Sequence, residues 1–216
     1  VVIKPLDGNH GKGATVGIKS LEDAMIAFEK AKEYSRYIIV EKQLIGEDFR
    51  ALVVNNRLIA VAERVPAHVV GDGKSSIQRL IDKTNEDPRR GYGHENVLTQ
   101  IDIDNQTLRC IKKAGYELES VLKKGERLLL KTTANISTGG TAIDRTDEVH
   151  PENVFLFERI AKIIGLDVAG VDVIAPDVSE PLGENGGGII EVNAAPGFRM
   201  HLSPSEGIGR NVAEHV

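Results

Sequence analysis

Three oxygen-bearing side chains near the end of the sequence could together bind a hard cation. Glu191 and Asn193 alternate in an apolar run that we interpret as a strand, so both side chains project from the same face. Asp172 lies in a second apolar run, Val168 to Ala175, which predicts a buried strand. Two carboxylates and an amide oxygen suit Mg²⁺, which leaves its other positions to water and phosphate. The alternative is a carboxylate pair at the surface ends of two core strands.

A glycine-rich segment at the other end of the chain could bind phosphate. A short strand from Val1 to Ile3 leads into Lys4, and three glycines and a second lysine follow between Gly8 and Gly13. Glycines let backbone N–H groups approach an anion, and lysines supply charge. The segment matches neither the dinucleotide fingerprint nor the Walker loop. The alternative is a flexible hairpin tip that is rich in glycine.

The elements expected to position these residues begin with a helix. Ser20 is a candidate N-cap, with Asp23 three residues later, and the helix is expected to continue to Tyr34. Apolar residues at helical spacing predict a face that packs on a sheet: Leu21, Ala24, Met25, Phe28 and Ala31.

A strand and a hairpin are expected after this helix. The run from Tyr37 to Leu44 predicts a strand that leaves into a connector, which could present backbone groups to an adenine. The alternative is an amphipathic strand end. Strands at 51–54 and 58–63 flank Asn55 and Asn56, and this pair predicts a tight turn because Asn tolerates positive φ.

The middle of the chain carries candidate anion-binding groups but little apolar content. Between helices expected at 75–85 and 105–114, the paired Arg89 and Arg90 could grip a carboxylate; the alternative is a solvated loop. We expect this part to cover a larger site rather than to form a domain. The small residues around Ser137 to Gly140 could donate hydrogen bonds to an anion. A last long helix is expected at 152–164.

Composition limits the function classes. The 216 residues are 27% charged and 41% hydrophobic, as in an ordinary globular protein. The net charge of −5 gives no basic footprint for nucleic acid or an anionic membrane, so neither is an expected partner. The single cysteine, Cys110, excludes an intrachain disulfide and fits a reducing cytoplasm. The chain begins without Met, inside an expected strand, and we take it to be an excised segment.

Four strings of residues make the chain resemble a known superfamily. They are Lys4 to Gly13, Arg64 to Ala67, Asn135 to Asp144 and Glu191 to His201. In this order they resemble the ATP-grasp superfamily over nearly the whole chain, and more narrowly the ATP-grasp domain of the cyanophycin synthetases. The second choice is the ATP-grasp half of fused glutathione synthetases, which looks similar around 87–91 and 137–140.

The resemblance implies an α+β fold of the ATP-grasp type, in which two α+β lobes hold ATP between them, with the N-terminal part of the fold missing. On this reading residues 1–63 are the lid and hinge lobe, 64–125 are an inserted helical and loop segment over the site, and 126–216 are the C-terminal lobe with the metal site.

The resemblance also implies an activity. An ATP-dependent carboxylate–amine ligase would form an acyl phosphate and add aspartate to the C-terminal carboxylate of an Asp-Arg polymer, with ATP and Mg²⁺ as cofactors and a homo-oligomeric full-length protein. We expect the truncated chain to be inactive alone. The alternatives are a glutathione-type ligase, which adds glycine to γ-glutamylcysteine, and a nucleotide-binding module without catalysis.

Residue roles follow from the same resemblance. Mg²⁺ would be held by Asp172, Glu191 and Asn193. ATP would be contacted by Lys4, Asn9, His10, Gly11, Lys12, Gly13, Glu41, Lys42, Leu44, Asp48 and Lys131, although many relatives have Glu at the ribose position of Asp48. The substrates would be contacted by Arg89, Ser137, Thr138, Gly139, Gly140 and Ser205. The tetrahedral intermediate would be stabilised by backbone N–H groups near Gly197 and by an arginine, for which the candidates are Arg64, Arg89, Arg90 and Arg199.

Overall fold

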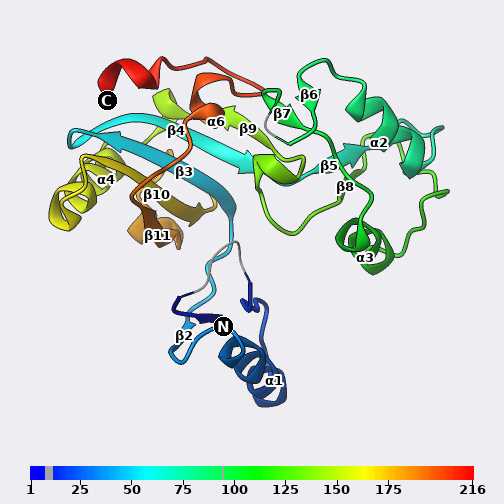
Figure 1. Cartoon of the computed structure of the whole chain (residues 1–216), viewed down its shortest axis with the longest axis horizontal. Coiled ribbons are helices and arrows are strands. Elements are labelled where there is room, and N and C mark those ends of the chain that lie inside the picture. Colours follow the sequence, from blue (N-terminus) through cyan, green and yellow to red (C-terminus); the bar gives the residue numbers. More distant parts are fainter. Residues whose placement is uncertain (8–11, 94) are drawn as a thin grey trace. The chain divides into compact units, whose positions relative to one another are not determined.

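The structure is a computed structural model that describes residues 1–7, 12–93 and 95–216, and it divides into two compact units, Val1–Ile45 and Gly46–Val216 (Figure 1). The sequence predicted boundaries after residues 63 and 125 instead. The structure differs because strand β4 (Arg57–Val65) crosses the first predicted boundary and belongs to the central sheet of the second unit.

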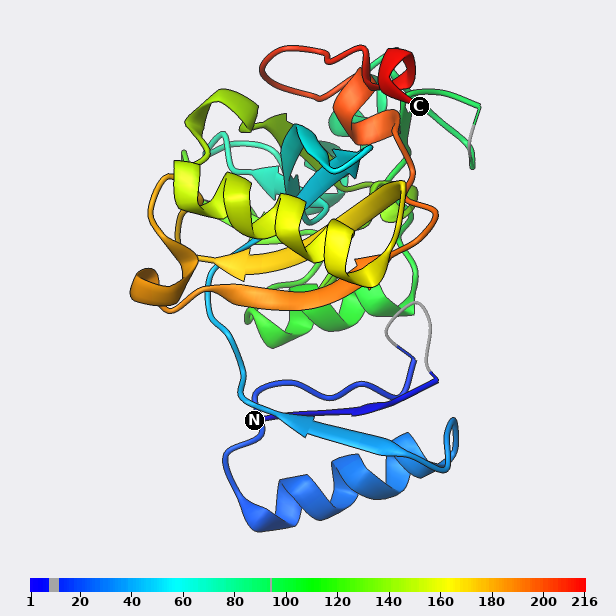
Figure 2. The same cartoon turned by 90° about the vertical axis from the view of Figure 1, so that its left-hand side faces the viewer.

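The first unit is a two-stranded antiparallel sheet packed against one helix. Strand β1 (Val2–Pro5) pairs with β2 (Ile38–Glu41), and a bridge joins Ile3 to Thr15. Helix α1 (Leu21–Lys32) lies along this sheet (Figure 2). A small core lies between them and consists of Ile3, Ile18, Ala27 and Ala31.

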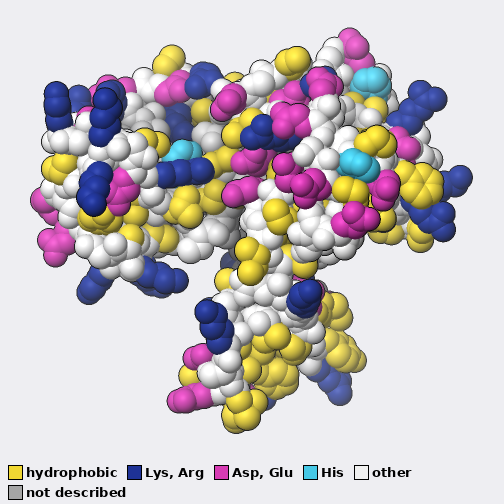
Figure 3. Space-filling view, turned by 180° about the vertical axis from the view of Figure 1, so that it is seen from behind, with side chains coloured by type: hydrophobic (Ala, Val, Ile, Leu, Met, Phe, Trp, Pro, Cys, Tyr) yellow, Lys and Arg dark blue, Asp and Glu magenta, His cyan; other side chains and the backbone are white. Residues whose placement is uncertain are grey.

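Helix α1 confirms the predicted cap and part of the predicted face, since Ala31 is buried and Ala24 packs against the small core. The Ser20 hydroxyl accepts a hydrogen bond from the backbone N–H of Asp23. However, Leu21 is 79% exposed and Met25 is 64% exposed, whereas Ala27 and Ala31 are buried. Small alanine side chains allow the helix axis to come close to the strands, so the larger residues point outward. Hydrophobic side chains are accordingly visible on the surface of this unit (Figure 3).

The second unit is built on a five-stranded antiparallel sheet in the order β11-β10-β3-β4-β9. Its strands are β3 (Glu47–Val54), β4, β9 (Thr141–Asp144), β10 (Val168–Ala175) and β11 (Gly188–Asn193). The predicted Asn55-Asn56 turn is confirmed, with φ angles of 49° and 62° in the left-handed region.

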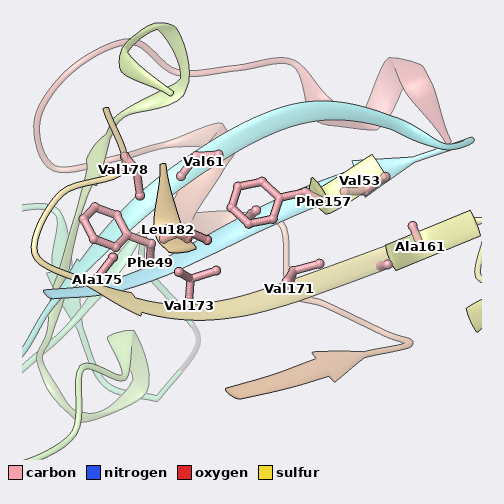
Figure 4. Packing of buried hydrophobic residues seen from close by; sticks show 12 residues of the cluster. Phe49, Val53, Val61, Phe157, Ala161, Val171, Val173, Ala175, Val178 and Leu182 are labelled. Carbon is pink, nitrogen blue, oxygen red and sulfur yellow. The ribbon is translucent and has the colours of Figure 1, made fainter. Parts of the chain in front are cut away.

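One face of this sheet is apolar and is covered by helix α4 (Pro151–Ile164). Phe157 and Ala161 of this helix pack on alternate residues of the strands, among them Phe49, Val61 and Val171 (Figure 4). Because side chains alternate along a strand, the charged residues between these apolar positions must lie on the opposite face. This alternation creates the polar face on which the candidate site lies.

Residues 67–130 form a second hydrophobic core inside the same unit. They contain β5 (His68–Val70), paired with β8 (Arg127–Leu129), the helices α2 (Ile77–Asn85) and α3 (Asn105–Lys113), and the short parallel pair β6 (Arg90–Gly91) and β7 (Leu98–Thr99). The buried residues are Ala67, Val69, Ile77, Leu80, Ile81, Ile101, Ile111, Leu122, Leu128 and Leu130. The expectation of thin apolar content was therefore wrong, because the core residues come from pieces scattered along the sequence.

The last part of the chain runs beside β9. Two short helices, α5 (Leu182–Asn185) and α6 (Arg199–Leu202), and the 3₁₀ turns Ile136–Thr138, Thr146–Glu148 and Val212–His215 complete the unit. The backbone N–H of Ser205 donates to the carbonyl of Ala142 at 2.7 Å, and that of Asp144 donates to the carbonyl of Glu206 at 2.9 Å. Among the described helices, none is both long and apolar enough to cross a membrane.

Candidate metal and substrate site

A buried network of two arginines and two aspartates occupies the polar face of the sheet. Asp172 of β10 stands opposite Arg50 of β3, and Asp48 of β3 stands opposite Arg64 of β4. Arg50 donates from Nε and Nη2 to the two oxygens of Asp172, and the Nη2–Oδ2 distance is 3.1 Å. Arg64 donates from Nε to Asp48 Oδ1 at 2.8 Å and from Nη2 to Asp172 Oδ2 at 3.1 Å.

Burial and pairing set the charge state of this network. Asp172 and Arg64 are each 7% exposed. Burial raises the pKa of Asp48 and outweighs the opposite effect of Arg64. Burial also tends to lower the pKa of Arg64, but the charges of Asp48 and Asp172 raise it above its ordinary value. Such charges are tolerated in a protein interior because each one has a hydrogen-bonded partner.

The three predicted metal ligands share this face. Asp172 lies directly opposite Glu191 in the β10–β11 register, and Gly170 lies opposite Asn193. Glu191 is exposed and Asn193 is half-buried. These oxygens fit Mg²⁺ by type and by face, and an ionised carboxylate offers about four lone-pair sites. The two arginines already use Asp172 as an acceptor of three hydrogen bonds, so a metal ion would compete with them.

The described residues contain no cluster of three or more His, Cys, Asp or Glu side chains arranged for metal binding. The predicted set of Asp172, Glu191 and Asn193 contains only two such side chains, because its third ligand is an amide. The metal assignment therefore remains a prediction that the register supports.

The turn after β11 lies over the sheet at Gly170. A Cβ on Gly170 would come within 2.6 Å of Pro196 Cβ and 3.2 Å of Arg50 Cδ. Only glycine leaves room for the Pro196 ring and the Arg50 side chain together. Gly197 is exposed, with open space on its Cβ side, and Arg199 begins helix α6 directly afterwards.

His201 of helix α6 was missed by the sequence analysis. It is 2% exposed, and neither ring nitrogen has a hydrogen-bond partner among the described residues. Burial, followed by the charge of Arg50, lowers the pKa of His201 to about 4; Arg64 acts in the same direction, and Asp144 opposes them. The ring is therefore neutral at pH 7. Its position in a short irregular segment gave no periodic signal of burial.

Arg90 holds backbone in place. It is 8% exposed, and its Nη1 donates to the carbonyls of Thr99 at 2.6 Å and Gly139 at 3.0 Å. Burial lowers its pKa below the ordinary arginine value. The sequence predicted a catalytic contact, whereas the structure uses Arg90 to fix the turn that contains Ser137 and Thr138.

That turn has the predicted compact form. Gly139 has a φ of 91°, and its Cβ position would lie 2.7 Å from the side chain of Ile101. A Cβ at Gly140 would lie 2.7 Å from the carbonyl oxygen of Asn135. The Thr138 hydroxyl donates to the Asn135 carbonyl at 3.0 Å, and Ser137 is exposed. Of the two hydroxyls, Ser137 is thus the one open to an incoming substrate.

The structure brings Arg89 and Ser205, both predicted substrate contacts, together. Arg89 Nη2 pairs with Asp87 Oδ2 at 2.8 Å, and its Nη1 donates to the carbonyl of Ser205 at 3.4 Å. The Ser205 hydroxyl oxygen is buried without a partner among the described residues.

Lys131 forms an ion pair with Asp104. It is 2% exposed, and its Nζ lies 2.7 Å from Oδ2 of Asp104, the N-cap of helix α3. Burial of Asp104 would raise its pKa, but hydrogen bonds from Lys131 and Thr107 lower it to about 2. The predicted contact between Lys131 and ATP stays a prediction.

The structure describes some of the predicted nucleotide-binding residues of the first unit. Lys4 Nζ lies 2.6 Å from Glu41 Oε1, so the predicted phosphate ligand is paired with a predicted adenine contact. Gly13 has a φ of 75°, and its Cβ position would lie 2.6 Å from the ring of Tyr34. Of the others, Lys12 and Lys42 are exposed, Leu44 is half-buried, and Asn9, His10 and Gly11 lie outside the described residues.

Comparison with known proteins gives a consistent result. No protein-family model matches the chain. The cyanophycin synthetase of Synechocystis sp. is 58% identical over 218 residues, which cover all of this chain and 25% of that protein. The bifunctional glutathione biosynthesis protein of Pasteurella multocida is 37% identical over 221 residues, which cover all of this chain and 29% of that protein.

A solved structure supports the same relationship. The crystal structure of a bifunctional glutathione synthetase from Pasteurella multocida matches 99% of this chain and 29% of its own, with a TM-score of 0.73 and 36% identity. The chain thus spans about a quarter of the length of the cyanophycin synthetases that it matches. Sequence and fold together place the chain in the ATP-grasp superfamily, among the ATP-grasp domains of the cyanophycin synthetase type.

Proposed function

We propose that the chain is the part of an ATP-dependent carboxylate–amine ligase that adds aspartate to the C-terminal carboxylate of an Asp-Arg polymer. The observation that carries the proposal is the 58% identity to cyanophycin synthetases over the whole chain, against 34–37% for the glutathione proteins. The register of Asp172 with Glu191, which supports the metal set, is consistent with it.

The chemistry asks mainly for positioning and charge neutralisation. A carboxylate is already ionised at pH 7 and can attack the γ-phosphate of ATP, which gives an acyl phosphate and ADP. An amine then attacks the acyl carbon, and phosphate leaves. Mg²⁺ held by Asp172, Glu191 and Asn193 would offset the repulsion between the carboxylate and the triphosphate.

The remaining residues of the site would bind and orient. Lys4, Lys12 and the amides near Gly13 would contact the phosphates. Gly197 is exposed, and backbone N–H groups near it would face the reacting carbonyl. Arg64, which is fixed by two aspartates, would supply positive charge beside the metal.

The residues predicted to contact the substrates would also bind and orient them. Ser137 is exposed on a turn that Arg90 holds, and it would donate to an anionic substrate. Arg89 is about half exposed, and its neighbour Ser205 lies along β9. Together they would line the wall that receives the incoming amino acid.

The decisive experiment compares amine and carboxylate substrates in the complete gene product. Phosphate release with ATP, Mg²⁺ and an Asp-Arg polymer primer should depend on aspartate and not on glycine. Release with γ-glutamylcysteine and glycine, and none with the primer and aspartate, would favour the glutathione-type reading. Nucleotide binding without phosphate release under either condition would favour a binding module.

The homo-oligomeric state and the cytoplasmic location expected from the sequence remain predictions. The mass of the native complete gene product in solution tests the first, and imaging of a tagged protein in its own cell tests the second.

A further inference from the structure

Unsatisfied polar atoms gather in one short segment of the second unit. Among the described residues, four buried side-chain polar atoms lack a hydrogen-bond partner, and three of them belong to His201 and Ser205. A buried polar group without a partner is destabilising, and a phenylalanine at position 201 would avoid this penalty. A partner for the imidazole in another state of the protein would remove this penalty.

Arg50 is the group best placed to become that partner. Both of its hydrogen bonds go to Asp172, whereas Arg64 is also held by Asp48. Its side chain lies against the Pro196 turn, which leads directly into the helix that carries His201. The charge of Arg50 is the largest charged influence on the pKa of the His201 ring, so the two side chains lie within electrostatic range of each other.

The other charged groups that act on His201 already have two hydrogen-bond partners each. Arg64 is bound to two aspartates. Asp144 accepts hydrogen bonds from Arg210 Nη2 at 2.7 Å and from the Thr146 hydroxyl. Of the three charged groups that shift the pKa of this ring, Arg50 alone bonds to a single side chain among the described residues.

We propose that His201 is a positioning residue that accepts a hydrogen bond from the Arg50 guanidinium when a metal ion occupies Asp172. A cation on Asp172 competes with Arg50 for the same oxygens and would leave a buried guanidinium unpaired. A neutral imidazole offers one nitrogen lone pair as the alternative acceptor. Burial keeps His201 neutral at pH 7, so the acceptor is available. The inference rests on the metal site of the proposed function.

The test measures metal affinity rather than turnover. Mn²⁺ binding to the complete gene product at saturating ADP is followed by electron paramagnetic resonance. His201→Phe should weaken Mn²⁺ binding by roughly 10-fold, since a hydrogen bond to a charged group is lost. His201→Gln keeps an acceptor and should restore most of the affinity. Without metal, the Phe variant should melt at the wild-type temperature or above it.

A double-mutant cycle with Arg50→Met identifies the partner. In that background, His201→Phe should have no further effect on Mn²⁺ affinity. Equal losses in both backgrounds, or wild-type affinity in the single Phe variant, would overturn the inference. If His201→Phe lowers only the melting temperature, the ring is merely structural and the inference also fails.

The Asp172→Asn variant distinguishes a failure of the metal site from a failure of the role of His201. Loss of Mn²⁺ binding in this variant, together with wild-type affinity in His201→Phe, leaves the proposed function standing and removes only the role of His201. Unchanged binding in Asp172→Asn, or no binding by the wild type, overturns both.

Discussion

Arg64 Nη2 lies 3.1 Å from Asp172 Oδ2, and the same guanidinium also binds Asp48, so one arginine joins a buried carboxylate to a half-buried one. Arg64→Met should therefore leave Asp48 and Asp172 short of positive charge and destabilise the chain by about 3 kcal/mol. Urea denaturation of the chain measures the change. Arg79→Met is the matched control, because the Arg79–Glu86 pair is 60% and 61% exposed and should contribute under about 1 kcal/mol. Similar midpoints for both variants would contradict the prediction.

Asp172→Asn should reduce aspartate-dependent phosphate release by the complete gene product by ~10²–10³-fold. Asparagine keeps the shape of the side chain but loses the charge that would hold the metal ion, and electrostatic contacts of this kind commonly have effects of that size. Glu184→Gln, which removes an exposed carboxylate elsewhere, should leave the rate unchanged. A rate for Asp172→Asn near that of the wild type would remove Asp172 from the metal site.

Arg89 and Arg90 are adjacent in sequence but should respond differently to substitution. Arg90→Met leaves the carbonyls of Thr99 and Gly139 without their donor and should destabilise the chain by about 2–3 kcal/mol. Arg89→Gln removes an ion pair whose arginine is exposed and should change stability by less than about 1 kcal/mol. Its main effect should be a higher KM for the amino acid. Thermal unfolding and steady-state kinetics of the two variants separate these outcomes, and equal melting temperatures would contradict them.

Burial of His201 should make the stability of the chain depend on pH. Its pKa is about 4 in the folded chain against an ordinary value of 6.5. Between these two values the unfolded chain binds a proton that the folded chain does not, so stability rises with pH across this window. The neutral His201 ring makes its full contribution to the free energy of unfolding above pH 6.5. This contribution, up to about 3 kcal/mol, is lost as the pH falls toward 4.

The measurement is urea denaturation at pH 4.5 and pH 7.0. The difference in unfolding free energy between these conditions should be smaller for His201→Phe than for the wild type, because phenylalanine does not titrate. The carboxylates of the chain titrate in both proteins, so their contributions to the pH dependence cancel in the comparison. An identical pH dependence would show that His201 is protonated as easily in the fold as in the unfolded chain.

Gly170→Ala tests the packing of the turn over the sheet. The new Cβ would lie 2.6 Å from Pro196 Cβ, so the turn or Arg50 must move. We expect a loss of about 1–3 kcal/mol in stability, as for other overpacked sites, together with weaker metal binding. Gly183→Ala is the matched control, since nothing lies within 4 Å of its Cβ position. Equal effects of the two substitutions would contradict this account.

Much of the fold follows from local patterns in the sequence. The cap at Ser20, the Asn55-Asn56 turn and the apolar strand from Val168 to Ala175 all appear as predicted. Each depends on residues close in sequence. The outward direction of Leu21 and the core of residues 67–130 were missed because they depend on contacts between distant segments.

The face shared by the predicted metal ligands could be predicted from the sequence, but the ion pairs of this face could not. The shared face of Asp172 and Glu191 follows from strand alternation and register. The pairing of Asp172 with Arg50 was missed, although an arginine inside the apolar run from Phe49 to Val54 was a visible signal. A charge at such a position needs a buried partner, and the sequence alone does not identify which strand supplies it.

The run of residues 204–206 beside β9 also has a consequence for self-association. The backbone bonds from Ser205 and to Glu206 occupy the outer edge of β9, which would otherwise expose unpaired N–H and C=O groups. An open edge of that kind recruits strands from other molecules. The tail therefore acts as a protective cover for the sheet, and a chain cut before Ser205 should form soluble aggregates or fibrils through β9.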